Sequence, residues 1–391
     1  MMSKKTLTNK ITVQSLLDLF PDELLDRLSD STNVDSHVKK LFGKNMFYLL
    51  LYGFLESTKV SLRGLEDIYN SQKFKFLFNI DQKNQLKYNS LSDRLAAMEP
   101  EYFKRIYEHS HSMFSDIFTD SEAEKHSIIR VDSTLVKEAA NKLQKGMTMG
   151  NQHRKNKYVK YTVSMEDLLP GEVELFTDQE EANENYTIPK VVINQKHKSG
   201  IFVFDRGVNK REVFDELDEE KISFVTRISP TKRLKVEDVR TLQCKKYSNL
   251  EISGDKTVRL YNKKGKLSKP FRLITTVKND GSGDELWFLT NCYELPLEEI
   301  ISIYGKRWDI EVFFRFIKQE LNFSHFVSTS VNGIKNVLYI TLTLSILILI
   351  YKKINNIGYK TAVRRFRIEL DELITKMMIT FSGGDPSLVF R

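Results

Sequence analysis

The sequence predicts a mixed α/β fold preceded by a helical N-terminal region, and three observations support this prediction. From about residue 12 to residue 117, apolar residues recur three and four positions apart, which is the period of amphipathic helices. Near Ser127 the pattern changes to short runs rich in β-branched and aromatic residues. Residues 230–285 are rich in turns and strand-like runs and show no helical period. We therefore expect an all-α segment, then an α/β sheet with a β-rich insertion.

The N-terminal helical pattern is clearest in the segments SLLDLF, VKKLFGKNMFYLLLYGFL and LSDRLAAMEPEYFKRIY. Turn signals such as SDSTN and NIDQKNQ divide this part of the chain into four or five helices. A chain of 391 residues has room for two or three domains of ordinary size. The first of them is expected to be a helical domain over residues 1–120.

The strand-like runs of the middle region are HSIIRVDSTLV, KYVKYTVSM, EVELFTD, GIFVFDRGV and ISFVTRIS. Helical stretches at 179–198 and 209–221 separate some of these runs, which is typical of a mixed sheet with helices between its strands. The expected organisation after the helical domain is a sheet-forming core, first part, over 121–229, a β-rich insertion over 230–290, a helix that completes the core over 291–330, and C-terminal helices over 331–391.

Composition narrows the class of protein. Apolar residues make up 41% of the chain and charged residues 29%, which excludes collagen-like and generally disordered proteins. The only cysteines are Cys244 and Cys292, so the sequence has neither a disulfide framework nor a cysteine-based zinc site. The N-terminus lacks the apolar core of a secretion signal. These features together predict a cytoplasmic protein.

The most apolar segment runs from Val337 to Tyr351. It contains Thr341, Thr343 and Ser345 and is shorter than the roughly 20 residues that a membrane span requires. We therefore expect a buried helix and no membrane association, with a membrane span as the alternative.

Basic residues are concentrated in two stretches of a chain whose net charge is +8. Residues 137–160 contain seven Lys or Arg and one acidic residue, and residues 232–278 contain fourteen against four. Each stretch could be a solvated lysine-rich surface. Aromatic residues among the charges favour a nucleic-acid surface instead, because lysine and arginine neutralise phosphates while rings stack on unpaired bases. The aromatic residues in question are Tyr158, Tyr161, Tyr247, Tyr261 and Phe271.

Two aspartates directly follow apolar strand-like runs, Asp132 after IIRV and Asp205 after IFVF. A carboxylate at the end of a buried strand is costly to desolvate unless a cation, a proton or several hydrogen-bond donors compensate. Each aspartate on its own could simply cap the following turn. If the two strands are parallel neighbours, however, both carboxylates lie at the same edge of the sheet.

A third carboxylate, Glu311, belongs to the segment YGKRWDIEVFFRFIKQEL, which we expect to form one largely buried helix. At about 100° per residue, four polar side chains of this helix fall within a stripe of roughly 60°. They are Tyr304, Arg307, Glu311 and Lys318. An internal Arg307–Glu311 ion pair of i,i+4 type, with Lys318 solvated, is the alternative explanation of this stripe.

Oxygen ligands from Asp132, Asp205 and Glu311 would suit Mg²⁺ or Mn²⁺. Two such ions about 4 Å apart can activate a water or a 3′-hydroxyl and stabilise the leaving oxygen during attack on phosphorus. The other polar side chains of the stripe could then hold a DNA strand through stacking and phosphate contacts. The pattern thus predicts a site that cleaves and joins phosphodiesters.

The polar stripe has the spacing Tyr304, two residues, Arg307, three residues, Glu311, six residues, Lys318. It resembles the YREK signature of DDE transposases of the insertion-sequence-four type, and RVDST and VFDRG resemble that family's two aspartate motifs. The resemblance implies an RNase H-like core with a β-rich insertion before the glutamate helix. It also implies two Mg²⁺ or Mn²⁺ ions, cut-and-paste transposition, and a homodimer that acts on inverted-repeat DNA ends and target DNA near the nucleoid.

Two further residues are candidates for DNA contacts. Trp287 lies upstream of the glutamate helix, where relatives carry a tryptophan that receives a flipped base, but it could equally be a core tryptophan. Arg206 follows Asp205 and could contact DNA or pair with a carboxylate. The alternative functions are a DNA-binding regulator derived from a transposase and an RNase H-like nuclease that cleaves without joining. The helical domain over residues 1–120 is expected to bind DNA and recognise the ends, which favours the transposase over the nuclease.

Overall fold

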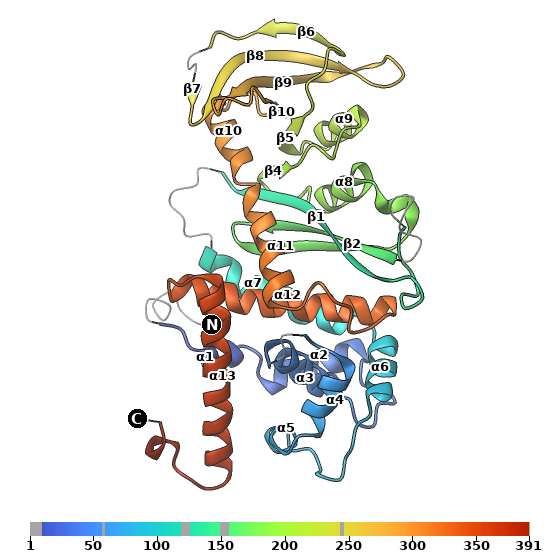
Figure 1. Ribbon diagram of the computed structural model, residues 1–391, viewed down its shortest axis with the longest axis vertical. Helices are drawn as coiled ribbons and strands as arrows, with labels where there is room; N and C mark the ends of the chain where they lie inside the picture. Colours follow the sequence, from blue (N-terminus) through green and yellow to red (C-terminus); the bar gives the residue numbers. More distant parts are fainter. Residues whose placement is uncertain (1–9, 57–58, 119–125, 149–155, 243–245, 391) are drawn as a thin grey trace. The chain divides into compact units, whose positions relative to one another are not determined.

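The computed structural model describes residues 10–56, 59–118, 126–148, 156–242 and 246–390 (Figure 1). The chain divides into two compact units, and each unit is built from stretches that are separate in the sequence. Unit 1 comprises Met1–Ile117, Val136–Lys157 and Arg315–Arg391, and unit 2 comprises Phe118–Leu135 and Tyr158–Phe314. The five domains expected from the sequence remain a prediction.

Unit 2 is built on one large mixed sheet with the strand order β3-β2-β1-β4-β5-β10-β9-β8-β6, and β7 pairs with β8 at the side. The neighbours β1, β4 and β5 are parallel, whereas the strands from β5 through β10, β9 and β8 to β6 are antiparallel. The strands are β1 Ile128–Ala139, β2 Asn156–Glu166, β3 Leu169–Phe176, β4 Ile201–Phe204, β5 Ser223–Ile228, β6 Leu234–Val239, β7 Lys246–Tyr247, β8 Leu250–Tyr261, β9 Leu267–Lys278 and β10 Glu285–Thr290.

Helices cover both faces of this sheet, and Figure 1 shows α8 and α9 on one side and α10 on the other. Side chains alternate between the two faces along each strand. Val131 and Phe204 belong to the core that packs against α8 and α9, while Ile128 and Val203 belong to the core that packs against α10. The helical elements of this part are η2 Gln179–Ala182, α8 Glu184–Asn194, α9 Arg211–Glu219, α10 Leu297–Gly305 and α11 Trp308–Glu320.

In unit 1 the N-terminal helices pack together with the C-terminal ones. The long helix α12 lies against α3, α6 and α13, and the buried Asn336 side chain donates hydrogen bonds to the carbonyl oxygens of Leu95 and Met98. The helices are α1 Val13–Leu17, α2 Asp22–Thr32, α3 Gly43–Glu56, α4 Leu62–Asn70, α5 Gln72–Leu77, α6 Tyr88–Ala97, α7 Glu101–Phe118, α12 Val331–Ile354, α13 Tyr359–Phe381 and η3 Pro386–Leu388.

Helix α12 contains the apolar segment that was expected to be buried. By length and composition it could cross a membrane, but 89% of its most apolar stretch is buried inside the structure. Its apolar surface is therefore used in helix packing, as in the core helix of a globular domain.

Candidate active site

Asp132 and Asp205 are brought side by side by strand register. The parallel pairing of β1 with β4 ends with Arg130 opposite Val203, and continuing it by two residues places Asp132 opposite Asp205. Both follow the alternation that turns Ile128 and Val203 toward α10, so both carboxyls face the same side of the sheet. One detail of the prediction is wrong: β1 continues to Ala139, so Asp132 lies within its strand and only the partner strand β4 ends there.

Asp132 carries little compensation for its burial. Desolvation raises the pKa of its carboxyl to about 7, and the negative charges of Asp205 and Glu184 add to this effect. The backbone N–H of Ser133 donates a hydrogen bond of 2.8 Å to Asp132 Oδ1, which opposes the shift. Arg307 also opposes it, but its Nη1 lies 3.9 Å from Oδ2. A further positive charge at this position would favour the ionised carboxylate.

Asp205 is held by the turn that follows β4. The backbone N–H of Gly207 donates a hydrogen bond of 2.6 Å to Asp205 Oδ1, so this aspartate does cap its turn, as the alternative interpretation expected. The cap uses one oxygen lone pair and leaves the rest of the carboxyl available for other contacts. Capping and participation in a site are therefore compatible here.

A fourth carboxylate, Glu184, joins the site and was missed by the sequence analysis. It is the first residue of α8, and its carboxyl lies beside that of Asp205, since a Cβ built at Gly207 would be 1.4 Å from Glu184 Oε2 and 2.9 Å from Asp205 Oδ1. Desolvation and the charge of Asp205 raise its pKa, while Lys160 lowers it. Lys160 on β2 is itself buried, and its ammonium donates a 2.6 Å hydrogen bond to the carbonyl of Ala182. Glu184 lies in a strongly acidic segment, so no pattern distinguishes it from its neighbours in sequence.

The predicted single helix of the polar stripe is interrupted. Helix α10 ends at Gly305 and α11 begins at Trp308, with a tight turn at Lys306 and Arg307 between them. Trp308 is 52% exposed, so this face of α11 is not buried as expected. The turn still keeps Tyr304 and Arg307 together, because the guanidinium of Arg307 lies 5.7 Å from the centre of the Tyr304 ring.

Arg307 connects two of the predicted catalytic carboxylates. Its Nη2 lies 2.6 Å from Glu311 Oε1, which is the i,i+4 ion pair of the alternative interpretation, and its Nη1 approaches Asp132. Burial raises the pKa of Tyr304 beside it, and Arg227 lies over the same ring at 5.8 Å. The structure thus links Tyr304, Arg307 and Glu311 to Asp132 through one guanidinium.

Arg130 fixes the turn between α10 and α11 to the sheet. This side chain is buried on β1, and its Nε donates a 2.9 Å hydrogen bond to the carbonyl of Lys306. Its guanidinium also pairs with Asp309 at 3.2 Å and donates to the carbonyl of Asp167 at 2.9 Å. Arg130 lies two residues before Asp132 on β1. The strand that contains Asp132 therefore also anchors the start of α11, the helix that contains Glu311.

The remaining predicted DNA-binding residues are Lys318, Trp287 and Arg206. Lys318 follows Glu311 on α11, in the stretch that belongs to unit 1, and burial lowers its pKa. Trp287 on β10 is partly buried against the core, and its Nε1 donates to Glu285 at 2.8 Å, which favours the core alternative. Arg206 is exposed and has no carboxylate within 4 Å among the described residues.

The donor chemistry of this group fits a hard divalent cation, since all candidate ligands are carboxylate oxygens. In the described part of the chain, however, no three His, Cys, Asp or Glu side chains are gathered in a way that could hold a metal ion. Arg307 occupies the position between Asp132 and Glu311. Binding of a metal by both residues would therefore require this guanidinium to release them.

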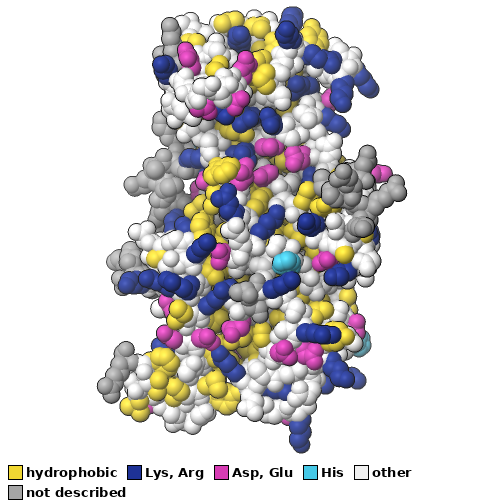
Figure 2. All heavy atoms as spheres, in the orientation of Figure 1, with side chains coloured by type: hydrophobic (Ala, Val, Ile, Leu, Met, Phe, Trp, Pro, Cys, Tyr) yellow, Lys and Arg dark blue, Asp and Glu magenta, His cyan; other side chains and the backbone are white. Residues whose placement is uncertain are grey.

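The basic stretch 232–278 is partly neutralised by ion pairs. Arg259 pairs with Glu237 at 2.5 Å, and Lys278 pairs with Asp284 at 2.8 Å. Figure 2 shows Lys and Arg side chains scattered over the displayed face, with Asp and Glu among them. Within the first stretch, 137–160, residues 149–155 lie outside the described part.

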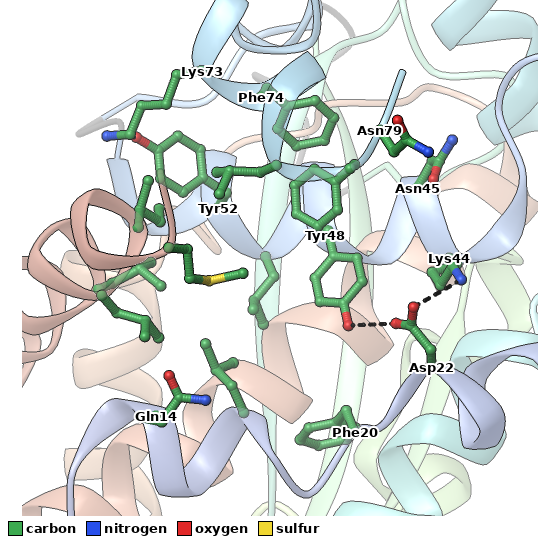
Figure 3. A pocket seen from close by; sticks show the side chains of 18 of the residues that line it. Gln14, Phe20, Asp22, Lys44, Asn45, Tyr48, Tyr52, Lys73, Phe74 and Asn79 are labelled. Atoms are coloured by element: carbon green, nitrogen blue, oxygen red, sulfur yellow. Dashed lines mark hydrogen bonds and ion pairs between the residues drawn. The ribbon is translucent and has the colours of Figure 1, made fainter. Parts of the chain in front are cut away.

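Unit 1 contains a separate cavity of about 730 Å³. Its wall is mostly apolar, with Phe20, Tyr48 and Phe74 among the lining residues (Figure 3). A polar group lies at one side, where Asp22 pairs with Lys44 at 3.1 Å and accepts a hydrogen bond from the Tyr48 hydroxyl at 3.4 Å. None of the carboxylates described above belongs to this cavity.

The chain is similar to known transposases. Residues 123–347, more than half of the chain, match the family described as "Transposase DDE domain". A stretch of 157 residues is 32% identical to y4zB of Sinorhizobium fredii, a protein named as a transposase, and covers 40% of this chain and 44% of that protein. A stretch of 139 residues is 28% identical to a protein of Geobacillus stearothermophilus named as a transposase for insertion sequence element IS5377, and covers 36% of each.

These matches span less than half the length of either curated relative. Among solved structures, the piggyBac transposase in a synaptic complex with hairpin DNA has a similar fold, with a TM-score of 0.53 over 96% of this chain and 83% of that one. The two sequences are only 11% identical, so this similarity concerns the fold alone.

Proposed function

Because this chain belongs to the family of transposases with a DDE domain, we propose that it cleaves DNA at the ends of an insertion sequence and joins them to target DNA. The observation that carries the proposal is the register of β1 and β4, which places Asp132 beside Asp205 on the sheet face that α10 covers. We assign the chain to the insertion-sequence-four type, with an RNase H-like core formed by β3-β2-β1-β4-β5.

In this proposal Asp132, Asp205 and Glu311 are the catalytic carboxylates and hold Mg²⁺ or Mn²⁺. When bound, the ions supply the charge that activates a water or a 3′-hydroxyl and stabilises the leaving oxygen. Arg307 pairs with Glu311 and lies near Asp132 in the free protein, and it would turn to a phosphate if the ions and the DNA were bound. The 2.6 Å contact with Glu311 and the 3.9 Å approach to Asp132 support this exchange.

The remaining contacts are assigned to DNA. Tyr304 stacks beside the bound strand, while Lys318 and Arg206 contact phosphates. Trp287 is the least supported of these assignments, because its ring packs partly against the core. The active form is a homodimer that holds two inverted-repeat ends together with the target DNA in the cytoplasm.

The test is metal-dependent cleavage and joining on a plasmid that carries the DNA flanking this gene. The wild type should nick at paired ends and give joined products with Mg²⁺ or Mn²⁺. Glu311→Gln should lower cleavage roughly 100-fold or more, since a metal ion contributes several kcal/mol to the transition state. DNA affinity should change little, because the substitution removes no phosphate contact.

Glu320→Gln provides the matched control, since it makes the same substitution at the other end of the same helix. Undiminished cleavage by Glu311→Gln would remove Glu311 from the site. Tight binding without nicks by the wild type would indicate a regulator derived from a transposase, and cleavage without joining would indicate a nuclease.

A further inference from the structure

We propose that Glu184 is a positioning residue of the active site, which holds the carboxyl of Asp205 in place and is itself held by Lys160. The inference rests on the proposed function, because the orientation of Asp205 matters only if Asp205 takes part in DNA cleavage. Neither the two aspartate motifs nor the polar stripe of α10 and α11 includes Glu184 or Lys160.

The first support is the direction of the Glu184 side chain. An acidic residue in the first turn of a helix is often explained by the favourable interaction with the helix dipole, which requires no partner. In α8 the capping role is filled by Asn183, whose Oδ1 accepts a hydrogen bond of 2.9 Å from the backbone N–H of Asn185. Glu184 is instead half-buried, and its carboxyl lies beside that of Asp205 at Gly207.

The second support is the space at Gly207. A Cβ at this position would lie 1.4 Å from Glu184 Oε2 and 2.9 Å from Asp205 Oδ1. The two carboxyls therefore meet above this glycine, in volume that any other residue would fill. Since the Gly207 N–H also binds Asp205 Oδ1, the aspartate is fixed by its own turn on one side and by Glu184 on the other.

The third support is the positive charge of Lys160 near Glu184. The buried ammonium of Lys160 attracts both Glu184 and Asp132, and its hydrogen bond to the Ala182 carbonyl fixes it just before the start of α8. Buried charges are retained when they are paired and hydrogen-bonded. The groups that face Glu184 are thus Asp205, Asp132 and Lys160, and of these only Lys160 is positive.

Residues that contact a metal-ligating carboxylate help to orient it, and the loss of such partners typically costs 10–100-fold in metal affinity or activity. Removing Glu184 should free the Asp205 side chain to rotate away from the sheet edge. The expected defect is therefore weaker metal binding by a protein that is still folded.

The experiment measures Mn²⁺ affinity of the full chain by electron paramagnetic resonance titration, with melting temperature and plasmid cleavage recorded in parallel. Glu184→Ala should weaken Mn²⁺ binding about 10–100-fold. Glu184→Gln should stay within about threefold of the wild type, because the side chain keeps its size and its amide N–H can donate to Asp205. Glu180→Ala is the control: this glutamate is exposed on η2, four residues earlier, and its removal should change nothing.

Gly207→Ala tests the same contact without deleting it, since the added Cβ must push the flexible end of Glu184 away. It should weaken Mn²⁺ binding as Glu184→Ala does, and the double variant should lose less than the product of the two single losses. Wild-type affinity in Glu184→Ala, or losses that simply multiply, would overturn the inference. A wild type that binds no Mn²⁺ would instead refute the proposed function, and the inference with it.

Discussion

Asp255 and Asp132 are largely buried aspartates of the same sheet, but they have very different partners. Asp255 lies in the antiparallel half, where Arg272 donates to both its oxygens at 3.0 and 2.6 Å and both side chains are at most 5% exposed. Asp132 lies in the parallel half, where Arg307 stays 3.9 Å away and binds Glu311 more closely. The first carboxylate is balanced within the fold, whereas the second lacks a full counter-charge, as expected of a cation site.

The largest loss of stability is expected when the fully formed ion pair between Asp255 and Arg272 is broken. Arg272→Met should lower the free energy of unfolding by roughly 3–5 kcal/mol, because it leaves the buried carboxylate of Asp255 unpaired. It also removes the hydrogen bonds that Arg272 donates to the carbonyls of Tyr293 and Leu295. Urea denaturation at pH 8 measures the change.

The control for this substitution is the double variant Asp255→Asn, Arg272→Met, which should be less destabilised than the sum of the two single variants. A loss below about 1 kcal/mol in Arg272→Met would mean that the ion pair contributes no more than an exposed one.

Asp132→Asn should raise the free energy of unfolding at pH 8, whereas Arg272→Met should lower it. The folded chain holds the pKa of Asp132 at about 7, whereas an unfolded aspartate has a pKa of about 3.9. Between these values the unfolded chain has released the proton that the folded chain keeps, so the free energy of unfolding falls as pH rises from about 4 to 7. Asparagine cannot ionise, so the variant should be more stable than the wild type by roughly 1–3 kcal/mol at pH 8 and no more stable near pH 4.

Urea denaturation at pH 4, 6 and 8 tests this prediction, with Asp255→Asn as the control that should be destabilised at pH 8. A variant Asp132→Asn that is less stable than the wild type at pH 8 would contradict the idea that this carboxylate lacks a counter-charge.

Arg307→Ala should have the smallest effect on stability, roughly 0.5–1 kcal/mol, because Glu311 is 31% exposed and can be solvated after the pair is lost. Since Arg307 lowers the pKa of Asp132, its removal should also move the pH-dependent loss of stability to higher pH. The same urea titration shows both changes, and Arg307→Lys should restore part of them. A loss of stability as large as that of Arg272→Met would instead mean that the ion pair of Arg307 with Glu311 stabilises the fold.

Local patterns predicted much of this architecture. The β-branched runs identified the strands that carry Asp132 and Asp205, and the spacing from Tyr304 to Glu311 identified residues that the structure joins through Arg307. Each of these signals is carried by a short stretch of sequence, where propensity and spacing are informative.

The features that the sequence did not predict depend on contacts between residues that are far apart in the chain. The turn at Lys306 is fixed by Arg130, so helical periodicity alone predicted a continuous helix across it. Glu184 reaches the site only because it packs against the turn after β4. In the sequence it lies among several other acidic residues, and the pattern does not distinguish it from them. The run HSIIRVDSTLV does continue past Asp132, but the neighbouring strand β2, which lies beside β1 in the sheet, cannot be identified from that run alone.

The hydrogen bond from Arg130 to the Lys306 carbonyl joins residues 176 positions apart. Such a contact forms late, since a long stretch of chain must be ordered before its ends can meet. At about 5–20 residues per second, a ribosome needs roughly 10–35 seconds to make the intervening chain. A nascent chain therefore carries Asp132 and Asp205 well before the start of the Glu311 helix can be anchored by Arg130, and the three proposed catalytic carboxylates can come together only after residue 311 has been made.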